Sequence, residues 1–562
     1  MEPSRRLPLL SAVPRATVPR TICLIKPPTL VAPRSLSYFG SVPSLGLAYV
    51  AAALREAGHR VSLIDAPGEA WDQRWPFPTA IGLLRGQGLS PEQVVARLPP
   101  DVEVVGVTHT LLHEWGLLRE RLLPAIRRRA PNALIVAGGE NASAYWDHML
   151  RECPALDACV LGEGEVTMLE LVEAWSAGRP AIEVPGVATR VEGEPRRGPP
   201  RSRMRELDRW PSPAWDLMPL EPYLSGRGHG GVARGRSLPV LTTRGCPYRC
   251  TFCSSPAMWT TRYERRDPAR VADEIEQLVA RYGICNVDLQ DLTALLTKRW
   301  LLQLCDELET RELGVTWQMP SGTRCEAIDE EAARRLYAAG CRNLCYAPES
   351  GSGAMLRRIG KRVQLPALMR SLEGAVAAGL KTEANIMIGM PHEQRGELLD
   401  SVRLAVRLAR SGLHSLSVMV FAPYPGSEEY RRLEQAGRIV HDERYLYGSL
   451  LRSAGGLTSY HPWLSPRQLL ALQLSMLLGF FAIQYARRPR RLGELLTNLV
   501  RGREQTVVDQ FVATKLRQLG QGWQMSPASD AGPPAARSRR WLGALARRWR
   551  ETSVPGQGPA FR

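Results

Sequence analysis

The chain has 562 residues, of which 44% are hydrophobic and 23% charged, which is typical of a folded globular protein and excludes a fibrous or wholly disordered one. Its formal net charge is +17, but residues 1–20 and 521–562 carry +3 and +5 of this, and the remaining +9 does not require a nucleic-acid partner. Eleven cysteines, an odd and modest number, argue against a secreted disulfide framework and predict a cytoplasmic protein.

After a leader (residues 1–20), residues 21–187 are predicted to form the first domain. Short apolar runs there predict strands, and the segments between them, including 45–57 and 117–129, have helical periodicity. The predicted strands are residues 22–25, 61–65, 104–107, 134–137 and 158–161. Strands that alternate with helices predict a doubly wound, Rossmann-like parallel sheet, which binds ligands at the carboxyl ends of its strands.

The residues that follow the third and fourth predicted strands indicate which ligand this sheet could bind. Thr108 and Thr110 follow the third strand and Gly138-Gly139 the fourth, whereas the GxGxxG dinucleotide fingerprint is absent. This spacing resembles the cobalamin-binding domain, in which a Ser/Thr pair and a later Gly-Gly line the slot for the nucleotide tail. The resemblance implies cobalamin binding by these four residues. The family's Asp-x-His-x-x-Gly motif is missing, so His109 is expected to form hydrogen bonds rather than to ligate cobalt.

A Pro-, Arg- and Gly-rich linker is predicted over residues 188–238, and a cysteine motif follows it. Cys246, Cys250 and Cys253 form a C-x3-C-x2-C sequence. Thiolates select iron–sulfur clusters or zinc, but a closed zinc site usually has four protein ligands, and no partner CxxC or HxxxH pair is present. Three thiolates on a four-iron cluster would leave one iron open to an outside molecule.

With Phe252 before its last cysteine, this motif resembles that of the radical S-adenosylmethionine (SAM) superfamily. Residues 239–440 predict six strand–helix units, consistent with that family's partial (β/α)6 barrel. The predicted strands are the one before Cys246 and residues 286–289, 315–319, 343–347, 384–388 and 416–421. Residues 389–393 (GMPHE) and 423–427 (PYPGS) resemble elements of its cobalamin-dependent branch.

The resemblance implies three cofactors: a [4Fe-4S] cluster, SAM and cobalamin. Cys246, Cys250 and Cys253 would ligate the cluster. The residues implied near SAM are Phe252, Asp291, Arg324 and Glu349. The sequence singles out no further catalytic residue.

The implied activity is C-methylation of a small specialised metabolite or lipid-like molecule. One SAM would methylate cobalamin, and a second would give a 5′-deoxyadenosyl radical that removes a hydrogen from an unactivated carbon. The alternatives are a radical cyclase or ring-rearranging enzyme, a methylthiotransferase, and a basic nucleic-acid-binding protein with a structural metal. An electron donor such as flavodoxin or ferredoxin is expected, and no nucleic-acid partner.

Residues 441–520 are predicted to be helical. Their apolar run 469–486 is near the length of a membrane span, but its polar residues favour a buried helix over membrane contact. The basic, Pro- and Gly-rich tail, residues 521–562, is predicted to be disordered.

Overall fold

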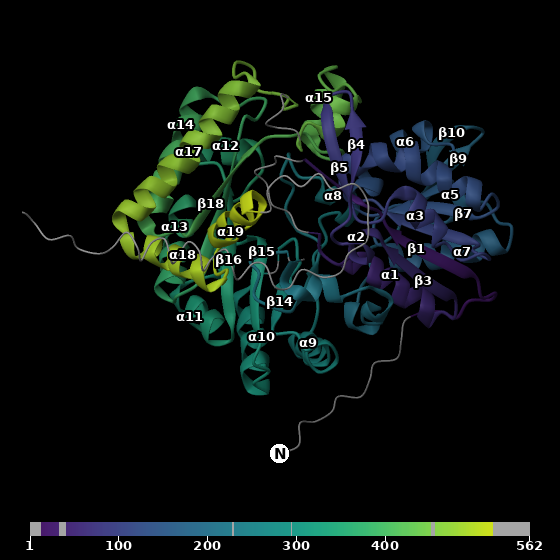
Figure 1. Cartoon of the computed structure of the whole chain (residues 1–562), viewed down its shortest axis with the longest axis horizontal. Coiled ribbons are helices and arrows are strands. Elements are labelled where there is room, and N and C mark those ends of the chain that lie inside the picture. The colour runs from purple at the N-terminus through teal and green to yellow at the C-terminus, as the bar shows by residue number, and fades with distance from the viewer. Residues whose placement is uncertain (1–12, 33–40, 228–229, 294, 451–455, 521–562) are drawn as a thin grey trace, which may run out of the picture.

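The computed structural model describes residues 13–32, 41–227, 230–293, 295–450 and 456–520. Residues 1–12 of the predicted leader and the whole predicted tail lie outside these ranges. The described chain contains two large sheets, one in the purple-to-blue N-terminal part and one in the teal-to-green part of Figure 1. The α/β class predicted from the sequence is confirmed.

The N-terminal sheet has seven strands in the order β10-β9-β8-β7-β6-β1-β3. Five are parallel, at the predicted places: β1 (Thr21–Lys26), β3 (Arg60–Asp65), β6 (Val104–Thr108), β7 (Leu134–Gly138) and β8 (Ala158–Val160). Alternate residues of β1 enter different cores: Ile22 and Leu24 pack with α1 (Leu45–Glu56) and α7 (Gly164–Ser176), while Cys23 and Ile25 pack with α5 (Leu123–Arg129) and α6 (Glu140–Glu152). Burial on both faces explains why these strands are continuous apolar runs.

Two parts of this region were not predicted. The antiparallel strands β9 (Val187–Val191) and β10 (Glu194–Arg197) extend the sheet into the predicted linker. Strands β2 (Thr29–Val31), β4 (Arg74–Thr79) and β5 (Gly82–Gln87) form a separate small sheet in the order β2-β5-β4. β4 contains Pro76 and Pro78, which argue against a central strand but are tolerated at a sheet edge, where β4 lies.

The second sheet is parallel, in the order β11-β14-β15-β16-β17-β18, and forms the predicted partial barrel. Its strands are β11 (Ser237–Val240), β14 (Asn286–Leu289), β15 (Thr316–Thr323), β16 (Cys341–Glu349), β17 (Lys381–Ile388) and β18 (Ser415–Val420). The connecting helices include α9 (Pro268–Tyr282), α10 (Lys298–Arg311), α11 (Glu330–Ala338), α12 (Gly353–Arg358), α13 (Leu365–Ala377) and α14 (Arg395–Ser411). In β17, Ala384 and Ile386 pack against α13 and α14, whereas Glu383 and Asn385, on the opposite face, are only partly buried. The inner face of the barrel is therefore polar here.

The C-terminal region is helical, as predicted, with α17 (Pro466–Arg487), α18 (Pro489–Arg501) and α19 (Val507–Gly520). α17 packs against α14 and β18 along one stripe that includes Leu469, Met476 and Phe480. Leu478 is 71% exposed, so the prediction of a buried helix is wrong for most of its surface. α17 is long and apolar enough to cross a membrane, but one such helix does not establish a span, because core helices of soluble proteins share this length and composition.

Candidate functional site

Of the predicted cobalamin residues, Thr108, Gly138 and Gly139 come together at the carboxyl ends of β6 and β7, and Thr110 lies exposed just after β6. Thr108 and Gly138 are register partners, and the His109 N–H donates to the Gly138 carbonyl oxygen over 2.7 Å. Gly139 has φ +112°, and a Cβ there would lie 2.9 Å from the His109 carbonyl oxygen, so this turn requires glycine. At Gly138 an added Cβ would meet only Val160, at 3.8 Å. The backbone at this edge therefore carries no side chains at Gly138 and Gly139, which fits a ligand that approaches it closely.

His109 is fully buried between these loops. Its Nε2 lies 3.1 Å from the Leu111 carbonyl oxygen, and its Nδ1 lies 3.3 Å from the Asn141 amide nitrogen. Burial lowers the pKa of His109 to about 3, so the ring is neutral. These contacts match the hydrogen-bonding role expected for it.

The three motif cysteines lie on the loop between β12 (Thr243–Arg244) and α8 (Ser255–Trp259), and all are partly exposed. The Thr293 hydroxyl donates to Cys246 Sγ over 3.5 Å, and the Thr251 N–H donates to the Ile359 carbonyl oxygen over 2.9 Å. Burial raises the pKa of Cys250 to about 11 and also raises that of Cys253. A cationic metal group bound by these thiols would oppose the effect of burial, because metals bind the thiolate form.

The four side chains implied near SAM lie around the same loop. Arg324, after β15, holds its guanidinium 4.1 Å from the centre of the Tyr248 ring. Its Nε is buried and has no hydrogen-bond partner among the described residues. Glu349 ends β16 with φ +66° and accepts a hydrogen bond from Lys361 Nζ over 3.0 Å. The sequence analysis missed Lys361, which follows α12 and carries no motif signal. The charges of Glu349 and Cys250 raise its pKa although burial lowers it.

Asp291 and Phe252 make contacts that hold the loop with the three motif cysteines (the cysteine loop) in place. Asp291 Oδ1 accepts hydrogen bonds from the Thr242 N–H and the Thr243 hydroxyl at 3.0 and 2.6 Å. Its Oδ2 is buried and has no partner within the part of the chain that the structure describes. Burial raises the pKa of Asp291 to about 6. Phe252 is partly buried against an apolar cluster that includes Met390. Asp291 thus secures the chain entering the cysteine loop and keeps one oxygen free.

Both loops meet at one junction. Glu140, the first residue of α6, accepts hydrogen bonds from the hydroxyls of Ser254 and Ser255 at 3.3 and 3.2 Å. Burial raises the pKa of Glu140. These serines directly follow Cys253, and Glu140 directly follows Gly139. The sheet edge at Gly138-Gly139 (the glycine edge) and the cysteine loop are therefore in contact.

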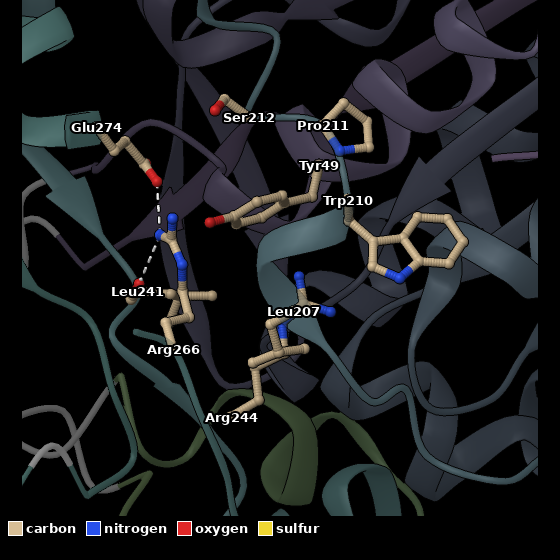
Figure 2. A pocket seen from close by; sticks show the side chains of 9 residues that line it. All are labelled: Tyr49, Leu207, Trp210, Pro211, Ser212, Leu241, Arg244, Arg266 and Glu274. Carbon is tan, nitrogen blue, oxygen red and sulfur yellow. Dashed lines mark hydrogen bonds and ion pairs between the residues drawn. The ribbon is translucent and has the colours of Figure 1, made fainter. Parts of the chain in front are cut away.

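A second junction lies around Arg244 at the end of β12, where the cysteine loop begins (Figure 2). Arg244 is buried, donates to Glu165 Oε1 over 2.7 Å and lies 4.9 Å from the centre of the Tyr49 ring. Arg266 donates to Glu274 Oε2 over 2.5 Å and to the Leu241 carbonyl oxygen over 3.1 Å. The cavity between these groups, about 20 Å³, is too small for a substrate. It marks where α1, the linker and the barrel pack together.

Known proteins resemble the chain over both parts of this site. The radical SAM superfamily model matches residues 240–405, which include the cysteine loop, and the B12 binding domain model matches residues 35–172, which include the glycine edge. A Pyrococcus horikoshii protein named uncharacterized methyltransferase PH0819 is 30% identical over 72% of this chain and 81% of its own. The anaerobic magnesium-protoporphyrin IX monomethyl ester cyclase of Rubrivivax gelatinosus is 27% identical over 72% of this chain and 69% of its own.

The fold is also found among solved structures. The cobalamin-dependent S-adenosylmethionine radical enzyme OxsB, solved with aqua-cobalamin and S-adenosylmethionine bound, aligns with a TM-score of 0.60 at 15% identity. The alignment covers 95% of this chain and 80% of OxsB. This similarity extends through the N-terminal sheet, the barrel and the helical C-terminal region.

Proposed function

Because the chain belongs to the radical SAM superfamily and carries a B12-binding domain, we propose that it is a cobalamin-dependent C-methyltransferase. It would move a methyl group from SAM to an unactivated carbon of a small specialised metabolite or lipid-like substrate. The contact of Glu140 with Ser254 and Ser255 carries the proposal, because it joins the edge that fits cobalamin to the loop that fits the cluster. Methyl delivery and hydrogen removal at one carbon require such proximity.

One set of residues would bind the iron–sulfur cluster and a second set would bind cobalamin. Cys246, Cys250 and Cys253 would hold a [4Fe-4S] cluster, and the cobalamin set is Thr108, Thr110, Gly138 and Gly139. When bound, the cluster with SAM supplies a 5′-deoxyadenosyl radical, and cobalamin supplies a methyl carrier.

The barrel residues would orient SAM. Neither the buried Arg324 Nε–H nor Asp291 Oδ2 has a partner in the described ranges, so the first could donate to a carboxylate and the second could accept from an ammonium or hydroxyl. Lys361 donates a hydrogen bond to Glu349 and places a positive charge near Cys250, which lowers the pKa of that thiol against the larger effect of burial. The polar inner face of β17, with Glu383 and Asn385, would meet the substrate.

We also propose where the enzyme acts and what reduces it. The enzyme would act in the cytoplasm and receive electrons from a donor such as flavodoxin or ferredoxin. No nucleic-acid partner is proposed.

A second candidate function is radical cyclisation without methyl transfer. It is supported by the Rubrivivax cyclase, whose similarity extends over 72% of this chain. Both functions require the same cofactors, so the product distinguishes them.

The test is the cofactor content of anaerobically reconstituted protein, compared with Cys250→Ala and with Cys285→Ala, an exposed cysteine away from the loop. We expect about four irons and one cobalamin per chain, with iron lost only in Cys250→Ala and cobalamin kept in all three proteins. Methyl-labelled SAM then tests candidate substrates for label transfer. Four irons without cobalamin would exclude the methyl-transfer proposal, and a turned-over substrate without label would favour the cyclase.

A further inference from the structure

Two histidines and a glutamate converge outside the site described above. His148 lies on α6, Glu434 lies on α15 (Glu428–Gln435), and His441 follows α15. Their ligand atoms all lie within 4.8 Å of one another. The cluster thus joins a helix of the N-terminal sheet domain to the segment that follows the barrel.

The distances suit one tetrahedral ion. His441 Nε2 and His148 Nε2 lie 3.1 and 3.5 Å from the same Glu434 oxygen, Oε1. With metal–ligand bonds of about 2.0–2.2 Å, two ligands of a tetrahedral zinc ion lie roughly 3.3–3.6 Å apart. Of the observed distances, 3.5 Å lies within this range and 3.1 Å lies just below it, and the His148 and His441 rings lie side by side with their centroids 4.1 Å apart.

The surroundings orient the ligands as metal sites require. Tyr145 OH lies 2.7 Å from His441 Nδ1, which leaves Nε2 facing Glu434. Tyr430 OH donates to Glu434 Oε1 over 2.6 Å, and the His148 ring is stacked on the Tyr145 ring with centroids 4.5 Å apart. Hydrogen bonds of this kind fix the rotation and tautomer of metal ligands.

The cluster is also accessible to a metal ion. The side chains of His148, Glu434 and His441 are 26%, 37% and 21% exposed, so an ion and a water as fourth ligand have access. A nearby pair, His392 and Glu429, lies 3.7 Å apart and belongs to no such group of three among the described residues.

We propose that His148, Glu434 and His441 bind a divalent zinc ion that fastens α6 to the segment after the barrel. Two imidazoles and one carboxylate are a zinc ligand set, and the two imidazole nitrogens disfavour cations that prefer sites made of oxygen ligands alone. α6 begins at Glu140, beside the cysteine loop, so the ion would restrain the helix that connects both candidate cofactor sites. The proposal does not depend on the reaction catalysed.

The test uses full-length protein with its iron content restored, incubated with one equivalent of zinc chloride and passed through a desalting column. Zinc and iron are then measured by mass spectrometry, and zinc affinity by competition with a fluorescent chelator. We expect about one zinc per chain in the wild type and in the control His392→Asn, and no retained zinc in Glu434→Gln or His441→Ala. Zinc should also raise the Tm of the wild type but not of these two variants.

Tyr145→Phe keeps all three ligands and removes only the hydrogen bond to His441, so it tests the site even if His441→Ala fails to fold. We expect it to weaken zinc affinity by about 10- to 100-fold. The proposal is overturned if the wild type retains no zinc, or if Glu434→Gln and Tyr145→Phe bind zinc as tightly as the wild type does.

Discussion

Ser255 donates its hydroxyl hydrogen to Glu140 Oε1 over 3.2 Å, two residues after Cys253 and one residue after Gly139. One hydrogen bond therefore links two loops from different sheets, each at the carboxyl ends of its strands. In the proposed reaction both cofactors act on the same substrate carbon, so the relative position of these loops determines whether the reaction is possible.

Replacing Glu140 with alanine should lower the Tm without changing iron or cobalamin content. The substitution leaves the Ser254 and Ser255 hydroxyls without their acceptor, and a hydrogen bond to a charged group contributes about 1.5–3 kcal/mol. Glu140→Gln keeps an acceptor oxygen and should retain most of the Tm. Equal Tm values for Glu140→Ala and the wild type would show that the link contributes nothing to stability.

Gly139→Ala should destabilise the protein and weaken cobalamin binding. The added Cβ would lie 2.9 Å from the His109 carbonyl oxygen at a φ of +112°, and strain of this kind costs about 1–3 kcal/mol. Gly178→Ala is the matched control, because Gly178 also has positive φ, +67°, but nothing lies within 4 Å of its added Cβ. Denaturant unfolding and titration with cobalamin measure both effects. Equal losses in the two variants would contradict this account of the turn.

Arg244→Met should cost about 3–5 kcal/mol of unfolding free energy, because it leaves Glu165 buried without its partner. Glu163 keeps Arg203, at 2.8 Å, so part of the network survives. The control is Arg334→Ala, which removes an exposed i,i+4 pair with Glu330 and should cost about 0.3–0.5 kcal/mol. Chemical denaturation compares the two, and similar costs would show that the buried network is not structurally important.

The sequence predicted the elements whose signals are local. The parallel strands are apolar runs because both faces are buried, and the cysteine motif is defined by spacing along the chain. Signals that depend on the fold were missed. Lys361 approaches Cys250 only through the loop after α12, and His148 and His441 are 293 residues apart in sequence. The composition of α17 predicted burial, but the helix lies on the outside of α14 and contacts it along one stripe.

Glu383 should make stability depend on pH. Burial raises its pKa to about 7, although the Ser417 hydroxyl, which donates to it over 3.2 Å, lowers the pKa. Below the ordinary value near 4.5 the carboxyl is protonated in both the folded and the unfolded protein. As pH rises from there towards 7, the unfolded chain releases the proton while the folded protein keeps it, so stability falls with rising pH and levels off above 7.

Glu383→Gln removes this titration and keeps the shape of the side chain. Its free energy of unfolding relative to the wild type should therefore increase between pH 5 and pH 8, by about 1–3 kcal/mol at roughly 1.4 kcal/mol per unit of pKa shift. Denaturant unfolding of both proteins at pH 5, 6, 7 and 8 measures the difference, in which the titration of all other groups cancels. A difference that is constant across this range would show that the carboxyl is ionised inside the barrel, with a cation or water beside it.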